Sequence, residues 1–379
     1  MYYKMRHSRK LVVYILLKSN RYEIHKMAIA AKLNGVQFDN EPVRRKFLDV
    51  RGGSSIIGVG KSIPDQVVRM TDLMHEIDTE RRFGVPEAWL EENTGIVESR
   101  AVSDDCLPSD LAISAAREAI EHAGIDPAQI GLVVFCSIDK DFAEPSTAHV
   151  VQQAVGATGV CFDVSSACHG FVHGLHIADA FIQLGQIDYA LVVAGETPSK
   201  ITHLIVDYLK NTNSKDEFIK MIGGVTTGDS GGAAILGPGK GIKRMLMLSE
   251  GEHYNLCSYK IENGSIKGQL IMNKLTFQGL KMHRDLWGQR DSRAARNTQW
   301  VVTHQTGRAL HQRMQKMTGV DANHVVTTYP FLGNLVSSTI PVNLSLLKER
   351  EDFSGKQNIL LMGSGSGLSV SHTYMEFEV

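Results

Sequence analysis

DVSSACHGFVHGLH, at residues 163–176, places one cysteine and three histidines within a short stretch of the chain. The apolar segment GVCFDVS just before the cysteine predicts a buried strand. The segment ACHGFVHGLHIADAFIQLG has apolar residues at helical spacing and predicts a helix that ends at Gly185. Cys168 is therefore expected at the start of a helix that directly follows a strand.

The same alternation of strand and helix extends on both sides of this stretch. Apolar runs predict strands at residues 54–60, 131–138 and 189–196, and helical spacing predicts helices at 109–125 and 146–157. Ser109 is the expected N-cap of the first helix, and Gly124 is its expected stop. Strands that are apolar on both faces and alternate with helices indicate the α/β class, with a mostly parallel sheet covered on both sides.

The second part of the chain repeats this rhythm. Residues 200–225 are polar and helical and read as an insertion or cap. Strands are then expected at 243–251, 299–304, 323–330 and 358–367, and helices at 277–292 and 338–350. We predict three parts: an N-terminal extension at 1–53, a first half at 54–238 and a second half at 239–379. The two halves are expected to be structurally similar and to share one core.

Composition narrows the functional class. The chain has 379 residues, 43% hydrophobic and 21% charged, with a net charge of -1. These values are ordinary for a cytoplasmic globular enzyme and give no reason to expect nucleic acid as a partner. Five cysteines without paired spacing indicate reduced thiols. The apolar run at 11–17 is too short to span a membrane. We expect a docked helix or strand there, with a targeting segment or a true start at Met27 as alternatives.

The position of Cys168 favours a nucleophile. The first N–H groups of a helix have no partner within the helix, and the helix dipole is positive there. We therefore expect a lowered pKa for the Cys168 thiol. The same N–H groups can hold the oxyanion that forms on an attached acyl group. The turn at Gly365 and Ser366, in the final GSGSG segment, could donate a second N–H.

Two polar residues follow predicted strands of the second half. His304 ends QWVVTH, and Asn334 lies in FLGNLVSST, after VVTTYP. Because active sites of α/β sheets assemble at the carboxyl ends of strands, we expect both residues near Cys168. There each could polarise a substrate carbonyl.

Five motifs resemble those of the condensing enzymes of the thiolase superfamily, in particular the β-ketoacyl-acyl carrier protein (ACP) synthase III group. They are WLEENTGIVESR, DVSSACHGFVHGLHIA, VVTHQTGRALH, FLGNLVSSTIP and LMGSGSGLSV, and the resemblance covers about residues 54–379. It implies a five-layered αβαβα thiolase fold, a homodimer and a catalytic triad of Cys168, His304 and Asn334. It also implies acyl thioester substrates, with no metal or other cofactor.

Two positions depart from the pattern of the initiating synthases in this group. The resemblance places a coenzyme A clamp at Trp89 and Asn93, but the arginine of that clamp is replaced by Asn93. The carrier of the acyl group, coenzyme A or ACP, therefore stays open. Glu144, in SIDKDFAEPSTAHVVQQAVG, stands where those synthases carry an apolar residue. This stretch is similar to the OleA-type and pyrone-forming synthases, in which the glutamate reaches into the partner's site as a base.

Glu144 bears directly on the expected reaction. A malonyl donor forms its carbanion by losing carbon dioxide, whereas a plain acyl thioester must lose an α-proton to a base. A carboxylate in an apolar tunnel has a raised pKa and is a stronger base. The resemblance thus implies a non-decarboxylative Claisen condensation of two acyl thioesters, with cyclisation of the product to a pyrone-type ring left open. The alternatives are a decarboxylating synthase III that uses malonyl-ACP and a non-catalytic partner subunit.

Other interpretations of these residues remain. Cys168 could be an ordinary buried thiol, and His169, His173 and His176 lie on one helical face, as metal ligands can. Satisfied core or interface histidines are the simpler interpretation. Glu144 could pair with Lys140 as a surface ion pair. Asp163 is expected to bond backbone groups. The segment GDSGG at 228–232 matches a serine-protease motif, but the strand–helix alternation argues against that fold.

Overall fold

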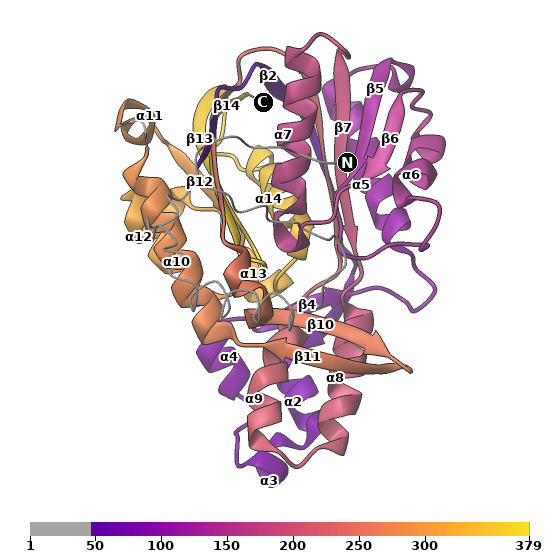
Figure 1. The fold of residues 1–379 in the computed structure, drawn as a ribbon, viewed down its shortest axis with the longest axis vertical. Coiled ribbons are helices and arrows are strands. Elements are labelled where there is room, and N and C mark those ends of the chain that lie inside the picture. The colour runs from indigo at the N-terminus through magenta and orange to yellow at the C-terminus, as the bar shows by residue number, and fades with distance from the viewer. Residues whose placement is uncertain (1–46, 291, 379) are drawn as a thin grey trace, which may run out of the picture. The chain divides into compact units, whose positions relative to one another are not determined.

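The computed structural model describes residues 47–290 and 292–378 (Figure 1). The segment expected at 11–17 lies outside the described residues, so that prediction stays untested. Within them, no helix is both long enough and apolar enough to cross a membrane.

Two five-stranded sheets form the body of the protein. In spatial order, the first contains β2 (Ser54–Ser62), β8 (Ser230–Pro238), β7 (Tyr189–Glu196), β5 (Ile130–Phe135) and β6 (Val160–Asp163). The second contains β1 (Leu48–Val50), β9 (Ile242–Ser249), β14 (Ser369–Glu378), β13 (Lys356–Gly365) and β12 (Trp300–Thr303). The order β2-β8-β7 in one sheet corresponds to β9-β14-β13 in the other. This shared order confirms the expectation of two similar halves.

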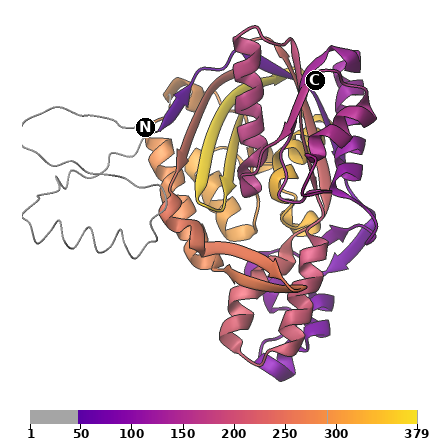
Figure 2. The ribbon, with the colours of Figure 1, turned by 45° about the vertical axis from the view of Figure 1, so that its right-hand side comes forward.

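Helices cover both faces of both sheets. Helices α7 (Gly170–Gln183) and α14 (Thr339–Lys348) lie between the sheets and share one core cluster with strands of both. Helices α5 (Pro108–Ala123) and α6 (Thr147–Val155) cover the outer face of the first sheet. Helices α10 (Met272–Gly288) and α12 (Arg308–Thr318) cover the outer face of the second. Figure 2 shows α7 between the two sheets. The layer order is αβαβα, as expected.

A smaller helical cap packs on this body. It contains α2 (Met70–Ile77), α3 (Thr79–Phe83), α4 (Trp89–Thr94), α8 (Ser199–Asn211) and α9 (Lys215–Met221). Two antiparallel strand pairs adjoin it: β3 (Gln66–Arg69) with β4 (Glu98–Ala101), and β10 (Cys257–Glu262) with β11 (Ser265–Leu270). The insertion predicted at 200–225 therefore forms α8 and α9. The remaining short helices are α11 (Ser292–Arg296) and α13 (Tyr329–Leu332).

The expectation of a mostly parallel sheet is wrong. Strand β5 runs parallel to β6 and β7, and β12 runs parallel to β13, but β8 and β14 run antiparallel to both of their neighbours. The strands are apolar throughout because both of their faces are covered. In β7, Ala190 and Val192 face the inner cluster, while Leu191 and Val193 face the outer one. Burial on two faces, not strand direction, explains the pattern.

Three local expectations also differ from the structure. The segment 323–330 forms no strand and contributes only a parallel bridge between Val325 and Val301. Helix α5 begins at Pro108, so its N-cap is Leu107 rather than Ser109, and Asp110 accepts a hydrogen bond from the Leu107 N–H (2.9 Å). Residues 48–50, within the predicted extension, form β1 and pair with β9.

Candidate active site

The backbone turns sharply at Cys168. The residue lies in a short 3-10 segment, Ala167–His169, between β6 and α7. Ala167 has a φ of +47°, a left-handed conformation that costs an alanine free energy and occurs mainly at functional sites. Gly170 follows, and a Cβ added there would lie 2.6 Å from the Cys136 carbonyl oxygen. The turn therefore packs closely against the end of β5, as the sequence predicted for a strand-to-helix junction.

The pKa of Cys168 differs from the prediction. Burial raises the pKa of this thiol above its usual value, and the neighbouring Cys257 and Glu196 add to the shift. The expected lowering by the start of the helix is therefore wrong, because the loss of hydration outweighs the nearby backbone N–H group. Cys168 is a neutral thiol at rest, and a base must accept its proton before it can act as a nucleophile.

One narrow cavity of about 90 Å³ brings five of the predicted residues together. Cys168, His304 and Asn334 line it, together with Gly365 and Ser366. These residues come from the 3-10 segment before α7, from the ends of β12 and β13 and from the loop after α13, which are far apart in the sequence. The carboxyl ends of β12 and β13 meet beside the cysteine as expected, but Asn334 follows α13, because the strand expected at 323–330 does not form.

His304 follows β12 and is 2% exposed. Burial lowers the pKa of its imidazole to about 4, and the Val336 backbone opposes this shift in part. Its Nδ1 has no hydrogen-bond partner among the described residues. A neutral imidazole at neutral pH can accept a proton from a thiol or donate a hydrogen bond to an oxygen. Both actions are useful beside Cys168.

Asn334 is held by backbone contacts on both sides. Its N–H donates to the Thr226 carbonyl (2.9 Å), and its own carbonyl accepts from the Gly228 N–H (3.0 Å). Its Oδ1 accepts a hydrogen bond from the Val336 N–H (3.0 Å). The Nδ2 amide is therefore the end of the side chain that can donate to a substrate oxygen. Val336 has a φ of +52°, an unusual conformation for a β-branched residue.

A network of buried histidines, which sequence reasoning missed as a unit, supports the glycine-rich turn after β13. A hydrogen bond of 2.8 Å joins His283 Nε2 to Ser364 Oγ, and one of 3.1 Å joins His283 Nδ1 to His372 Nε2. On the other side, 2.8 Å separates His169 Nε2 from Ser371 Oγ. Burial lowers the pKa of each of these histidines, so all are neutral near pH 7. These histidines stand within apolar segments of the sequence, and this was the signal from which their burial could have been predicted.

His169 is therefore a hydrogen-bonded core histidine, the simpler of the two interpretations. Its Nδ1 lies 3.4 Å from His173 Nδ1. Among the described residues, ligand atoms close enough together to hold an ion occur at Glu250, Glu252 and His253, not on this helix.

The cavity that holds Cys168 adjoins a second, outer pocket of about 320 Å³. Both are lined by Gly223, Met272, Thr276, Thr306 and Leu310. Trp89 and Asn93 lie at the outer pocket, together with Lys220 and Arg308. Asn93 Nδ2 donates to the Trp89 carbonyl of its own helix (2.7 Å). The two predicted substrate-binding residues thus line a pocket next to the cavity that holds Cys168.

Glu144 does not lie in this cavity. It is exposed, in the loop between β5 and α6. The alternative ion pair with Lys140 is not observed, because Lys140 Nζ lies 3.6 Å from Asp163 Oδ2. Asp163 also accepts hydrogen bonds from the N–H groups of Thr147 (3.1 Å) and Ala148 (2.9 Å), as expected of a residue that bonds backbone groups.

The GDSGG segment has a structural role. Asp229 accepts hydrogen bonds from the backbone N–H groups of Val102 and Ser199, both at 2.8 Å. Ser230 bonds Ser338 through their hydroxyl groups. Both residues are buried in β8 or beside it, and no histidine is bonded to Ser230 among the described residues. A serine-protease site is therefore not formed here.

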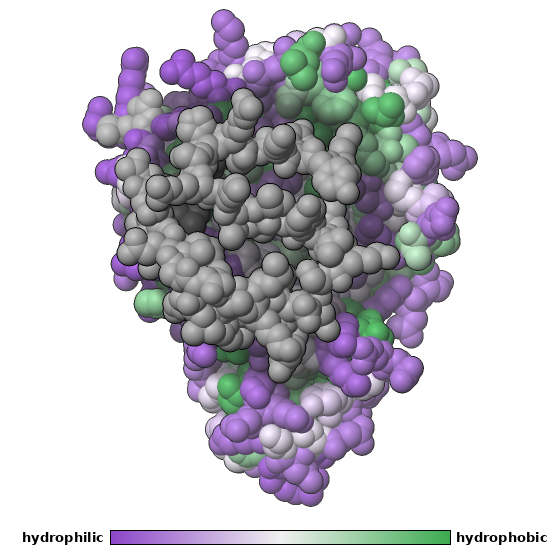
Figure 3. Space-filling model, in the orientation of Figure 1, coloured by the Kyte–Doolittle hydropathy of each residue, from purple (hydrophilic) through white to green (hydrophobic). Residues whose placement is uncertain are grey.

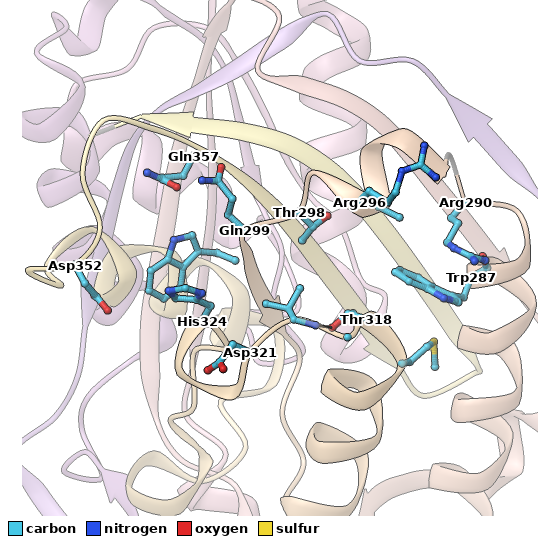
Figure 4. Close-up of a pocket in the computed structure, with 15 residues that line it drawn as sticks. Trp287, Arg290, Arg296, Thr298, Gln299, Thr318, Asp321, His324, Asp352 and Gln357 are labelled. Atoms are coloured by element: carbon cyan, nitrogen blue, oxygen red, sulfur yellow. Dashed lines mark hydrogen bonds between the residues drawn. The ribbon is translucent and has the colours of Figure 1, made fainter.

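Another hollow, with a volume of about 700 Å³, lies elsewhere, against the end of α12 and the start of β12. Figure 4 shows Trp287, Arg290 and Arg296 on one side of it, and His324 and Gln357 on the other. None of the predicted catalytic residues lines it. It is open and largely polar, which does not suit an acyl chain.

Two segments of the chain match one family. Residues 162–251 match 3-oxoacyl-[acyl-carrier-protein (ACP)] synthase III, and residues 290–377 match the C-terminal part of the same family. A β-ketoacyl-[acyl-carrier-protein] synthase III of Neisseria meningitidis is 29% identical over 337 residues, which are 86% of this chain and 99% of that protein. An acyl-CoA:acyl-CoA alkyltransferase of Xanthomonas campestris pv. campestris is 30% identical over 302 residues, 76% of this chain and 88% of that protein.

Solved structures agree with these relatives. A histidine variant of Xanthomonas campestris OleA superposes with a TM-score of 0.79 at 27% identity and covers 86% of this chain and 98% of its own. A cerulenin-bound OleA structure has a TM-score of 0.78 at 26% identity, with the same coverage of both chains. The chain has the thiolase fold and belongs to the β-ketoacyl-[acyl-carrier-protein] synthase III family of condensing acyltransferases.

Proposed function

We propose that the protein condenses two acyl thioesters without decarboxylation, through an acyl-cysteine on Cys168. The proposal rests mainly on where the acidic side chains lie relative to the cavity. Among the described residues, no acidic side chain lines the cavity that holds Cys168, His304 and Asn334. Glu144 stands exposed on the loop between β5 and α6, with no ion pair among the described residues. A carboxylate that serves as a base must come from outside this cavity.

In the first half-reaction, Cys168 attacks the thioester carbonyl and its proton passes to His304. The N–H groups of Cys168 and of the Gly365–Ser366 turn hold the oxyanion. When the tetrahedral intermediate collapses, the carbon–sulfur bond of the substrate breaks and the leaving thiolate takes the proton from His304. The products are acyl-Cys168 and a free thiol, and His304 is neutral again.

In the second half-reaction, Glu144 removes the α-proton of a second acyl thioester. His304 and Asn334 donate hydrogen bonds to the enolate oxygen, and the α-carbon attacks the acyl carbonyl on Cys168. The bond from that carbonyl to the cysteine sulfur then breaks, and the thiolate takes up the proton that Glu144 removed, so that Glu144 is a carboxylate again. The product is a β-keto thioester.

We propose that Glu144 acts in the site of a second copy of the chain. Strand β6 lies at the edge of its sheet, and Val160 on it is 58% exposed. Phe142, two residues before Glu144, is 47% exposed. Figure 3 shows apolar residues near the upper ends of α7, β5 and β6. An exposed apolar edge strand suits pairing with a second copy, which would carry Glu144 into an apolar environment.

The outer pocket, next to the cavity that holds Cys168, suits a phosphate-bearing carrier. Lys220 and Arg308 line the outer pocket beside Trp89 and Asn93. Both coenzyme A and the phosphopantetheine arm of a carrier protein present phosphate groups that such cations bind. We propose that the acyl carrier enters here, with Trp89 and Asn93 in contact with it.

The relatives support the chemistry. One of them is named as an acyl-CoA:acyl-CoA alkyltransferase, which joins two acyl-CoA substrates by its name. The solved OleA structures include variants of a single glutamate, a single cysteine and a single histidine, the same residue types that the proposal uses. Other relatives are named as β-ketoacyl-ACP synthases III, and their reaction is the second candidate.

A test with one substrate separates the two reactions. Purified protein is given a single long-chain acyl-CoA with no malonyl donor, and free CoA and the organic product are measured. We expect continued CoA release and a β-keto product. Glu144→Gln should leave Cys168 acylated but reduce turnover by about a hundredfold or more. The control is Glu121→Gln, an exposed glutamate on α5, which should behave as wild type.

The same experiment also has a result that would contradict the proposal. A single equivalent of CoA, an acylated Cys168 and no condensed product would contradict the proposal. It would favour the decarboxylating reaction with malonyl-ACP.

A further inference from the structure

One face of α10 lines the catalytic cavity. The residues on it are Met272, Leu275, Thr276 and Gly279, spaced three or four apart. The next residues on this face, Met282 and His283, are fully buried and do not line the cavity. Gly279 is therefore the innermost residue that α10 contributes to the cavity.

Gly279 is buried but faces open space. A Cβ added at Gly279 would meet no atom within 4 Å. The other glycines of the same cavity differ. A Cβ at Gly223 would lie 2.7 Å from Met272 Cγ, and one at Gly224 would collide with Ile205. Close packing therefore explains why positions 223 and 224 are glycine, but it does not explain why position 279 is glycine.

Backbone conformation does not explain Gly279 either. It lies in the interior of a 17-residue helix and is not among the residues with a positive φ. A glycine in a helix interior is less stable than an alanine there. The consequence of having no side chain at this position is additional room in the cavity.

The surroundings of this space suit a hydrocarbon. Leu275, Leu368 and Val370 line the cavity with Gly279, between α10 and β14. No charged side chain lines the cavity among the described residues. The same cavity holds Cys168, so a chain attached to the sulfur can extend along this wall.

We propose that Gly279 is a specificity-determining residue, whose missing side chain admits the acyl chain carried by Cys168. The inference rests on the proposed acylation of Cys168 and adds a residue that sets the permitted chain length. A larger residue at 279 would shorten the space without touching Cys168, His304 or Asn334. It would therefore change which chains are accepted rather than whether the thiol reacts.

The experiment measures acylation of Cys168 across a series of straight-chain acyl-CoAs, from butyryl to palmitoyl, by intact-protein mass spectrometry. The variants are Gly279→Ala and Gly279→Leu. The matched control is Gly288→Leu, because Gly288 ends the same helix, is exposed and also has no atom within 4 Å of an added Cβ. Thermal unfolding is followed for every variant. Because short chains need less room, their acylation reports whether the fold and the nucleophile are intact.

We expect Gly279→Leu to slow acylation by the longest accepted chains by about tenfold or more, while butyryl-CoA reacts at the wild-type rate to within about twofold. Gly279→Ala should keep the wild-type profile with a raised unfolding temperature, and Gly288→Leu should match wild type. An unchanged profile in Gly279→Leu would overturn the inference alone. Equal slowing of all chains would also overturn it, because the space would then serve the carrier arm. Failure of every acyl-CoA to acylate wild-type Cys168 would instead overturn the proposed function, and the inference with it.

Discussion

At Cys168, two effects act on the thiol in opposite directions. The N–H groups at the start of a helix favour the thiolate by about 0.3–1 kcal/mol, which is less than one pKa unit. Cys168 is partly buried, and the loss of hydration there favours the neutral thiol more strongly than the N–H groups favour the thiolate. The effect of burial is the larger of the two, so the pKa of Cys168 is raised. In the proposed mechanism, His304 rather than the helix therefore activates the thiol.

The pH dependence of acyl loading tests that assignment. Burial lowers the pKa of His304 to about 4, so the imidazole is neutral and able to accept a proton at all pH values well above 4. We expect the loading rate to show no inflection near 6.5, the usual value for histidine, and to fall only as pH approaches about 4. The measurement is the burst of CoA release against pH, with circular dichroism as a check of folding.

The His304→Ala variant provides the control for this profile. We expect loading about 10²–10⁴-fold slower, because the general base is missing. Its rate should rise with pH well into the alkaline range, since the thiolate must then form unaided. An inflection near 6.5 in wild type, or an unchanged rate in His304→Ala, would argue against His304 as the proton acceptor.

The candidate residues could be predicted because their signals are local. Cys168, His304 and Asn334 each follow an apolar segment, and the carboxyl ends of such segments meet in this class of fold. The pKa of Cys168 could not be predicted, because it depends on how completely the surrounding elements exclude water. The bond between His283 and Ser364 joins residues that are distant in sequence and has no local signal.

At the scale of elements, Asp163 fixes the start of α6, which directly follows the loop that carries Glu144. Its carboxylate accepts hydrogen bonds from the N–H groups of Thr147 and Ala148, two of the unpaired donors at the start of the helix. We predict that Asp163→Ala lowers the free energy of unfolding by about 1–3 kcal/mol, measured by urea denaturation. We also expect condensation to fall more than loading, because the Glu144 loop loses its support.

Asp163→Asn is the matched control, because its amide oxygen can still accept one of these hydrogen bonds. It should lie between wild type and Asp163→Ala in stability. Equal stability of all three proteins would show that the side chain does not hold α6.

Most elements could be predicted from periodicity, but their pairing could not. The segments at 54–60, 189–196 and 358–367 became strands β2, β7 and β13 as expected. The direction of β8 and β14 depends on which strands lie beside them, and an apolar run carries no such information. The segment at 323–330 has the composition of a strand but forms only one bridge, beyond β12 at the sheet edge.

At the scale of the whole molecule, two similar halves place the cysteine on one half and His304 and Asn334 on the other. The boundaries at 53/54 and 238/239 stay a proposal, although β1 shows that residues just before 54 belong to the second sheet. The alternation of apolar strand segments with helical segments in both halves indicated the duplication, because each half must bury its own sheet on both faces. The exposed position of Glu144, outside the cavity of its own chain, had no signal beyond the resemblance.

The most direct test of the account uses mixed dimers of Glu144→Gln and Cys168→Ala, purified with two different tags. Each variant alone should form no condensed product from a single acyl-CoA. In the mixed dimer, Glu144 of the Cys168→Ala chain meets Cys168 of the Glu144→Gln chain, so one of two sites is complete. The account predicts about half of the wild-type rate per dimer. A mixed dimer that remains inactive, beside an active wild type, would contradict the claim that Glu144 acts across the dimer.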